Sequence, residues 1–469
     1  MVIAPRRRHP PAPWRQAWDL TIEVSYAIDH RRSQVRDDAI ATTVMLGLPG
    51  FRVLAVSEHD GEVEQAVETT AEDGWCPACG VRAKLHDRRP TWVRDLPAAG
   101  RPVTLVWVKR VWRCHEPRCA KRTWTETSEA IQARCVLTER ARREACRRVG
   151  EDGHTVASVA ADLGVGWGTV MTAVRDHGNP LVEDPGRLEH VNTVGVDETA
   201  FLAATPLSGT RFATGIVALN GRPRLLDVVE GRSGTALCGW VSGRDQAWRD
   251  GVRVAALDPF RGYATALRTT LPNVTRVLDA FHVVRLGLTA LEEVRRRVQQ
   301  DTLGHRGRRD DPLFRIRRVL RRGYEHHTDR SWARLLAGLE AGDVDQQIGR
   351  AWIAAQELRL LYRDTSRARA ERRLLRWFTD IAEHEIPELL RLARTLDAWR
   401  DELLAYFDTG GVSNGPTEAM NALIKKIKRI GHGFRNFANY RLRLLLHCGV
   451  DWHTPNVTPI RGRPPRLAA

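Results

Sequence analysis

The sequence predicts an α/β protein in which a mixed sheet with flanking helices carries a large helical insertion. Residues 190–283 alternate between strand-like and helical patterns, residues 284–408 are almost entirely helical and charged, and residues 409–449 contain a last helix. A β-rich segment with paired cysteines and a pair of short helices precede this part. The length of 469 residues agrees with about two to four domains.

The charge balance favours a polyanionic partner. Lys and Arg number 73 against 57 Asp and Glu, which gives a net charge of +16. Nucleic acid is the first candidate, because neutralising phosphates supplies most non-specific affinity for DNA. The alternative is a soluble protein whose Arg-rich composition has no such partner. The hydrophobic share of 42% predicts a packed globular protein rather than a disordered one.

The cysteines and the absence of apolar runs indicate a compartment. Eight cysteines are few for this length, and four of them form two close pairs, which favours a reducing environment and a metal site over disulfides. No apolar run follows the basic residues 6–8, so we expect no signal peptide. No apolar stretch reaches about 18 residues, so we expect no membrane partner. We therefore expect a cytoplasmic, nucleoid-associated protein.

The first part of the chain is expected to be β-rich after an extension. Residues 1–43 are rich in Arg and Pro and are expected to be poorly ordered, and residues 450–469 form a basic tail. Residues 44–135 are the β-rich segment. Within it, residues 50–70 alternate around a His-Asp-Gly turn, which predicts a hairpin, and RPVTLVWVKRVWRC is its clearest later strand.

Two cysteine pairs in this segment predict a structural zinc site. Cys76 and Cys79 have CxxC spacing, and Cys114 and Cys119 form a second, looser pair, in which His115 is an alternative ligand. Two such knuckles can close a tetrahedral site of soft thiolates. Four sulfurs leave no open position, so a structural role is expected rather than a catalytic one. The alternative is four ordinary buried thiols.

Residues 136–180 predict a helix-turn-helix. The segment TVASVAADLGVGWGTVMTAVRDH (155–177) places aliphatic residues on one face of each of two short helices, separated by a Gly-Val-Gly turn. The second helix would enter a DNA major groove. The expected DNA-facing residues are Trp167, Thr169, Thr172 and Arg175. The alternative is an ordinary pair of packed helices.

The pattern after residue 190 reads β-β-β-α-β-α-β. The expected strands are 191–201, 210–220, 223–232, 252–258 and 274–280. The expected helices are 234–249 and 261–271, with the last helix of this part at 416–430 after a Gly-Gly break.

Three acids stand where an RNase H-like fold would carry catalytic carboxylates. Asp197 lies near the end of the first strand, and Asp258 ends the fourth. Glu418 lies in the first turn of the last helix, because Pro416 suits a first helical position. If the two strands are adjacent and parallel, both aspartates emerge at the same edge of the sheet.

Phosphodiester chemistry explains why carboxylates are needed there. Two Mg²⁺ or Mn²⁺ ions roughly 3.5–4 Å apart activate a water and stabilise the leaving oxygen, and hard cations prefer carboxylate oxygens. Each acid also has a plainer interpretation. Asp197 could cap a strand while its neighbour Glu198 is the ligand, Asp258 could belong to an Asp-Pro turn, and Glu418 could favour the helix N-terminus electrostatically.

The last helix predicts a DNA contact. Asn421, Lys425 and Lys428 recur at helical spacing with Glu418, and Arg429 follows directly. Cations on this face could bind DNA phosphates beside the carboxylate. The alternative is an amphipathic helix with a solvated Lys face.

The chain resembles the DDE transposases of bacterial insertion sequences, of the ISL-three type, over about residues 44–449. The resemblance rests on the CPAC and CHEPRC knuckles, VGVDE, LDPFRGY, LDAFHVVRL and, most specifically, NGPTEAMNALIKKIKRIGHGFRNFANYRLR. It implies that Asp197, Asp258 and Glu418 are the catalytic metal ligands, with two Mg²⁺ or Mn²⁺ ions per site. Asp279 and His282 of the DAFH stretch match family landmarks and are expected to support the site without binding the metal.

The resemblance also implies a function. The protein would bind the terminal inverted repeats of an insertion sequence through residues 76–178, cut DNA to free a 3′-OH, and join that end to target DNA. A homodimer or higher assembly on double-stranded DNA is expected, because two ends must be joined. The alternatives are a transposase-derived DNA-binding regulator without catalysis and a metal-dependent nuclease without strand transfer.

Overall fold

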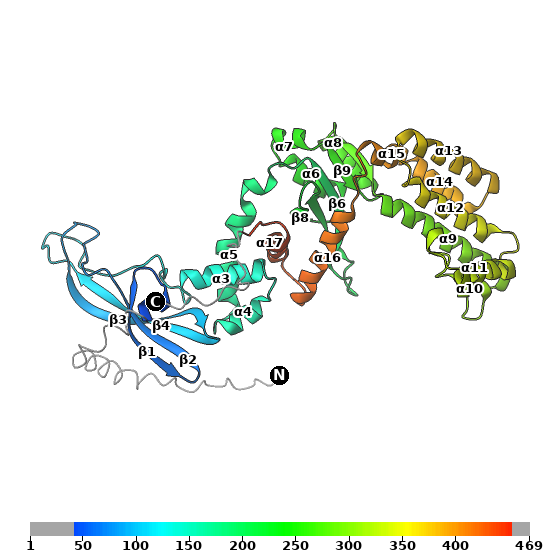
Figure 1. Cartoon of the computed structure of the whole chain (residues 1–469). Coiled ribbons are helices and arrows are strands. Elements are labelled where there is room, and N and C mark those ends of the chain that lie inside the picture. Colours follow the sequence, from blue (N-terminus) through cyan, green and yellow to red (C-terminus); the bar gives the residue numbers. More distant parts are fainter. Residues whose placement is uncertain (1–41, 453–469) are drawn as a thin grey trace, which may run out of the picture. The chain divides into compact units, whose positions relative to one another are not determined.

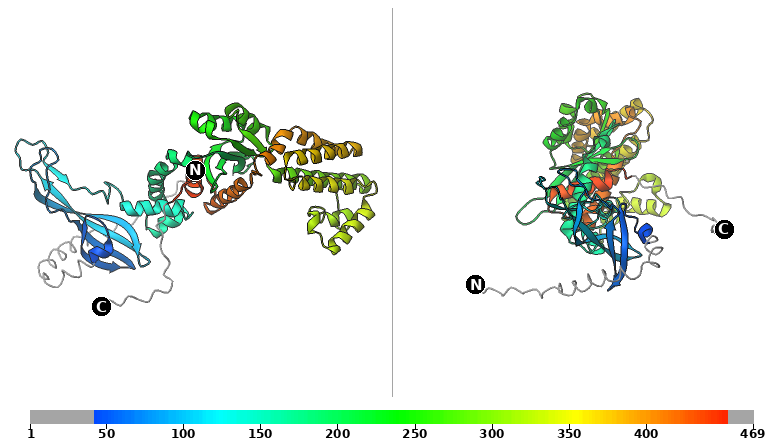
Figure 2. Two further views of the ribbon diagram at one scale, coloured as in Figure 1. Left: turned by 45° about the horizontal axis from the view of Figure 1, so that its top comes forward. Right: turned by 90° about the vertical axis from the view of Figure 1, so that its left-hand side faces the viewer.

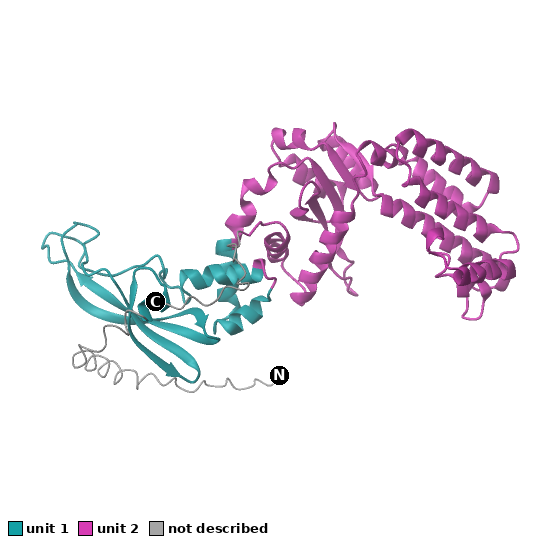
Figure 3. Ribbon diagram, in the orientation of Figure 1, with its two compact units in different colours: residues 1–149, 154–177 teal, residues 150–153, 178–469 magenta. Residues whose placement is uncertain are grey.

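The computed structural model describes residues 42–452, so most of the predicted extension and nearly all of the basic tail lie outside the described residues. The chain divides into two compact units (Figure 3). Unit 1 contains the chain up to Val149 together with His154–His177, and unit 2 contains Gly150–Gly153 and the chain from Gly178 onward.

Unit 1 begins with a five-stranded sheet in the order β1-β2-β4-β3, with β5 paired to β4. The strands are β1 (Phe51–His59), β2 (Glu62–Thr69), β3 (Lys84–Ala98), β4 (Arg101–Arg113) and β5 (Thr123–Thr125). β1 and β2 form the predicted hairpin. Their turn residues, Asp60 and Gly61, both have positive φ angles (49° and 80°), as a two-residue hairpin turn requires.

Alternation along β4 explains which face of this sheet is buried. Val103, Leu105 and Trp107 are at most 3% exposed, whereas the residues between them are half-buried. The Trp107 ring meets Phe51 of β1 edge-on, with 5.4 Å between ring centroids. The first half of β3, in contrast, is exposed along its length.

Three helices complete unit 1 and reach its boundary. They are α3 (Glu139–Gly150), α4 (Val156–Asp162) and α5 (Trp167–Glu183). The Thr155 hydroxyl accepts a hydrogen bond from Ser158 N and caps α4. Among the described residues, no single helix is long and apolar enough to cross a membrane, and α4 and α5 pass that test only together, bent by 111° at their break.

Unit 2 is built on a five-stranded sheet with the order β10-β9-β6-β7-β8. The strands are β6 (Thr193–Leu202), β7 (Arg211–Ala218), β8 (Arg224–Glu230), β9 (Val254–Leu257) and β10 (Thr275–Leu278). β6, β7 and β8 are antiparallel neighbours, whereas β6, β9 and β10 run parallel. This order and these directions are those of an RNase H-like sheet, which confirms the predicted fold class.

Helices flank this sheet, as Figure 1 shows. α8 (Arg261–Thr270) packs against α6 (Gly234–Ser242), while α16 (Gly415–Ile430) packs against β6 and α17 (Phe437–Cys448) against β8. The sequence predicted one helix over 234–249, but the structure has two. Helix α6 ends at Ser242, with Gly243 as its C-cap. Asp245 then caps a separate helix, α7 (Gln246–Gly251), by accepting a hydrogen bond from Trp248 N.

The predicted helical insertion runs between β10 and α16. Its helices are α9 (Ala280–Leu303), α10 (Pro312–Ile316), α11 (Asp329–Gly342), α12 (Gln347–Leu361), α13 (Arg367–His384), α14 (Pro387–Asp397) and α15 (Arg400–Asp408), with the 3-10 turn η2 (Tyr324–His326). The long helix α9 packs against α12 and α14, and α15 returns to β10 (Figure 2). One hydrophobic core extends from the sheet into these helices, so the insertion is held firmly on the strands that carry the candidate site.

Candidate functional site

Asp197 and Asp258 meet at one edge of the sheet of unit 2. The parallel register of β6 and β9 ends at the pair Val196 and Leu257, and each aspartate is the next residue on its strand. The Asp197 side chain is largely buried. Burial, followed by the nearby charge of Asp258, raises the pKa of Asp197 to about 7. Without a cation, the two carboxylates therefore resist being charged together.

Asp279 and His282 join the same edge from the third parallel strand. Asp279 follows β10 directly and caps α9, and its Oδ2 accepts a hydrogen bond from His282 N at 3.2 Å. The His282 ring lies between two carboxylates, with Nε2 3.0 Å from Asp258 Oδ2 and Nδ1 3.1 Å from Asp279 Oδ2. Burial disfavours the charged ring, but these carboxylates outweigh it and raise the pKa of His282 to about 10.

The first turn of α16 completes the cluster. Asn414 is fully buried, donates from Nδ2 to Asp258 Oδ1 at 3.0 Å and to the carbonyl of Val196 at 3.3 Å, and donates its backbone N–H to Asp279 Oδ1 at 2.8 Å. A side chain at Gly195 of β6 would overlap Asn414 and Thr417. The glycine therefore lets the helix terminus approach the strand closely.

Glu418 faces Asp279 and His282. One ligand atom from each of these three residues lies within 4.8 Å of the others. Within residues 42–452, no hydrogen bond or ion pair of the Glu418 carboxylate is found. This carboxylate is thus the one in the cluster that is left without a compensating donor.

The donor set of this cluster suits a hard divalent cation. Asp197 and Asp258 follow neighbouring residues of the paired strands β6 and β9, whereas the described residues of unit 2 whose ligand atoms lie close enough together to share one ion are Asp279, His282 and Glu418. Asp279 and His282, which were expected only to support the site, therefore lie nearer to Glu418 than the sequence suggested. Carboxylate oxygens in both groups suit Mg²⁺ or Mn²⁺. In the structure the negative charge is partly offset by the His282 ring and by the amides of Asn414 and Asn421.

Asn421 lies elsewhere than the sequence suggested. It was expected to face DNA, but it is 6% exposed and donates from Nδ2 to Asp197 Oδ2 at 2.5 Å. Lys428 is half-buried and donates to the carbonyl of Ala200 at 2.6 Å. Lys425 and Arg429 are exposed, as expected for residues that contact DNA. The helical spacing could not show that the first turns of α16 pack against β6.

Two further residues lie beside this cluster. Glu198, the alternative to Asp197, forms an ion pair with Arg232 at 3.3 Å. Asn414 was not singled out from the sequence, although it begins the NG motif that carries Glu418. The motif itself was the signal that could have identified it.

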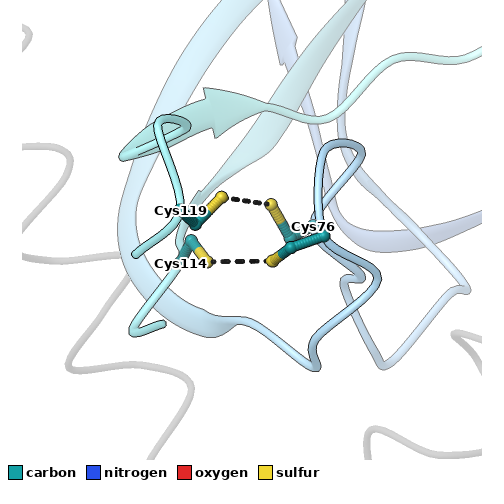
Figure 4. A group of neighbouring side chains, drawn as sticks. Cys76, Cys114 and Cys119 are labelled. Carbon is teal, nitrogen blue, oxygen red and sulfur yellow. Dashed lines mark hydrogen bonds between the residues drawn. The ribbon is translucent and has the colours of Figure 1, made fainter. Parts of the chain in front are cut away.

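The four expected cysteines of unit 1 converge (Figure 4). The sulfurs of Cys76 and Cys119 lie 3.7 Å apart and those of Cys79 and Cys114 lie 3.6 Å apart. A tetrahedral zinc with bonds of about 2.3 Å places its sulfurs roughly 3.8 Å apart, so the arrangement fits zinc. All four are free thiols, and three of them are buried.

The two helices expected to form a helix-turn-helix are α4 and α5, and their role in binding DNA stays a prediction. Val159 of α4 and Val170 and Val174 of α5 are fully buried, and the 111° bend between the helices lies in the range of this motif. The expected DNA-facing set is at the surface, with Trp167, Thr172 and Arg175 exposed and Thr169 half-buried. Helix α5 continues to Glu183, beyond the expected end near residue 177.

Comparison with known proteins gives two family matches. A transposase family model of the DDE type, named for ISL3, matches residues 194–444. A second model, described as the zinc-finger of transposase IS204/IS1001/IS1096/IS1165, matches residues 72–119. No curated protein matches. Among solved structures, the "Drosophila P element transposase strand transfer complex" is similar at 9% identity, with a TM-score of 0.37, over 68% of this chain and 95% of that chain.

Proposed function

The chain belongs to the ISL3 family of DDE transposases, and from this premise we propose that it binds the terminal inverted repeats of an insertion sequence, cleaves DNA there and transfers the freed strand to target DNA. The proposed catalytic metal ligands are Asp197, Asp258 and Glu418. Asp279 and His282 are proposed as supporting residues.

The observation that carries this proposal is the convergence of acids from distant parts of the chain. Asp197 and Asp258 are neighbours on paired parallel strands. Glu418 arrives more than 150 positions later and still lies beside Asp279 and His282. A fold that places several carboxylates together, with one imidazole to offset only part of their charge, accepts electrostatic repulsion, which bound divalent cations would relieve.

The residues of the chain have separable tasks in the proposed reaction. Mg²⁺ or Mn²⁺, held by Asp197, Asp258 and Glu418, would activate the attacking water or the 3′-OH of DNA and would stabilise the leaving oxygen. Asn421 orients Asp197, and Asn414 orients Asp258, through the hydrogen bonds described above. Lys425 and Arg429, exposed on α16, are placed to hold DNA phosphates near the carboxylates.

DNA recognition is proposed for unit 1. The zinc segment and the helix-turn-helix would read the element ends, with Trp167, Thr169, Thr172 and Arg175 at the bases or the backbone. Because two ends must be brought together, a homodimer or higher assembly on double-stranded DNA is proposed.

The decisive experiment replaces the three carboxylates one at a time. Asp197→Ala, Asp258→Ala and Glu418→Ala should each lower cleavage and strand transfer by at least about 100-fold, because each loses a ligand of the reacting centre, while DNA binding by unit 1 persists. The measurement is product formation on DNA carrying the element end, with Mg²⁺ or Mn²⁺, beside a binding assay.

Glu198→Ala is the matched control. Glu198 is adjacent on the same strand but is paired with Arg232, so its loss should have a mild effect. Full activity in all three alanine variants would instead favour a DNA-binding regulator. Cleavage without joined products would favour a nuclease.

A further inference from the structure

An open pocket lies beside the start of α9, outside the carboxylate cluster. Its walls include Phe281 and Val284 of α9, and Arg359, Tyr362 and Arg363 at the end of α12. The cavity volume is about 220 Å³. Sites for whole small molecules are larger, roughly 300–1,000 Å³, so this pocket suits a single planar ring.

Phe281 is the aromatic wall of this pocket. Its side chain is 55% exposed although it precedes His282 directly in the sequence. The two rings meet edge-on, with centroids 5.8 Å apart and planes at 89°. The exposed ring is therefore open to contact with a ligand, one residue along the chain from His282.

The rim of the pocket is cationic. Arg359 and Arg363 both lie 2.8 Å from Glu325, so two guanidinium groups share one carboxylate. The Arg363 side chain is 56% exposed. The surplus positive charge suits a phosphate, which arginine recognises with its planar group of donors.

Tyr362 also lines the pocket. The buried Tyr362 hydroxyl has no hydrogen-bond partner within residues 42–452. Burial, and next the charge of Asp279, raises the pKa of Tyr362. Tyr362 therefore lines the pocket with its ring, while its hydroxyl stays buried.

We propose that this pocket, the base pocket, binds one unstacked nucleobase of the DNA strand that enters the carboxylate cluster. Phe281 stacks on the base, and Arg359 and Arg363 hold an adjacent phosphate. Aromatic stacking accepts every base, so the base pocket would fix the strand without reading its sequence. Enzymes that act within duplex DNA commonly extrude a nucleotide in this way. The proposal rests on the proposed function, because it needs DNA at the carboxylates.

The test compares the affinity of the full chain for two short duplexes that differ by one unpaired thymine. Wild-type protein should prefer the duplex with the unpaired base, because the cost of unstacking has already been met. The Phe281→Ala variant should lose this preference by roughly 5- to 150-fold, the range expected for loss of one stacked base. Its affinity for the fully paired duplex should fall by less, because unpairing a base of that duplex already opposes its entry into the base pocket.

Two variants and a cross-link define the outcome. Leu375→Ala, which removes a comparably exposed apolar side chain (46%) from α13, should keep the preference, and Phe281→Trp should restore it. A 5-iodouracil at the unpaired position should photo-cross-link to the peptide that contains Phe281. An unchanged preference in Phe281→Ala, or a cross-link confined to unit 1, would overturn the base pocket. Both readouts are independent of cleavage, so the failure of the proposed catalysis would be recognised separately, by the carboxylate variants.

Discussion

Asn414 connects three parts of the candidate active site. It bonds Asp258 and the β6 backbone through its side chain and Asp279 through its N–H, and it is fully buried. No described residue pairs with its Oδ1 atom. One asparagine thus fixes the start of α16, and with it Glu418, relative to both aspartates.

We predict that Asn414→Ala lowers cleavage far more than its effect on stability explains. The substitution leaves buried acceptors unsatisfied, which costs about 1–3 kcal/mol of unfolding free energy, and it releases Asp258. Thermal unfolding and cleavage rates should be measured together. Thr328→Ala is the matched control, since it removes the cap of α11 in the insertion at a similar cost of about 0.5–2 kcal/mol. Equal losses of activity in the two variants would show that Asn414 contributes only to stability and does not position Asp258 for cleavage.

The residue types of the site could be predicted from the sequence better than their contacts. Asp197 and Asp258 could be predicted because strand ends are marked by apolar runs and the strands proved parallel. The burial of Asn421 against Asp197 could not be predicted, because the two residues are 224 positions apart in the sequence. The spacing of residues on a helix does not reveal which of its turns a distant strand covers. Likewise, nothing in DAFH shows that His282 would lie between Asp258 and Asp279.

At the scale of elements, the four-cysteine cluster of unit 1 lies apart from the hydrophobic core of its sheet. The cysteine cluster of unit 1 is supported by one partly buried aromatic residue, Trp124. So small an apolar cluster contributes little stability, and a metal is the usual compensation.

We predict that the cysteine cluster binds about one zinc per chain, as four-thiolate sites do. Cys76→Ser should abolish zinc binding and lower solubility or end binding, while unit 2 stays folded. Elemental analysis of protein purified without chelators measures the metal. Cys135→Ser, outside the cluster, should keep its zinc. Zinc-free wild-type protein would contradict the prediction.

The elements of unit 2 were predictable from pattern because each carries a clear signal. Strands β6 to β10 coincide with apolar runs in the sequence, and Gly and Pro mark the start of α16. The break between α6 and α7 was missed because Gly243 and Asp245 fall within a segment of otherwise helical spacing. The capping residues at the two helix ends produce this break, and capping residues are weaker signals in a sequence than hydrophobic periodicity.

At the scale of the whole molecule, positive charge and sequence recognition have different consequences. The net charge of +16 is spread over the chain, whereas the candidate groove-reading residues are confined to α5. Phosphate contacts weaken steeply as salt rises, while base contacts discriminate between sequences at any fixed salt.

We therefore predict that Arg175→Ala reduces the preference for element-end DNA over random DNA by about 5- to 150-fold, as loss of one base contact of about 1–3 kcal/mol implies. The slope of log affinity against log salt concentration should change by no more than the loss of one phosphate contact would change it, which is about 1. Lys425→Ala, on α16, is the comparison, because an exposed phosphate contact should weaken binding to both DNAs equally and reduce the salt slope. Binding isotherms at several salt concentrations separate the two effects. If Arg175→Ala instead weakens both DNAs equally, α5 holds the backbone, and sequence recognition must reside in another part of the chain.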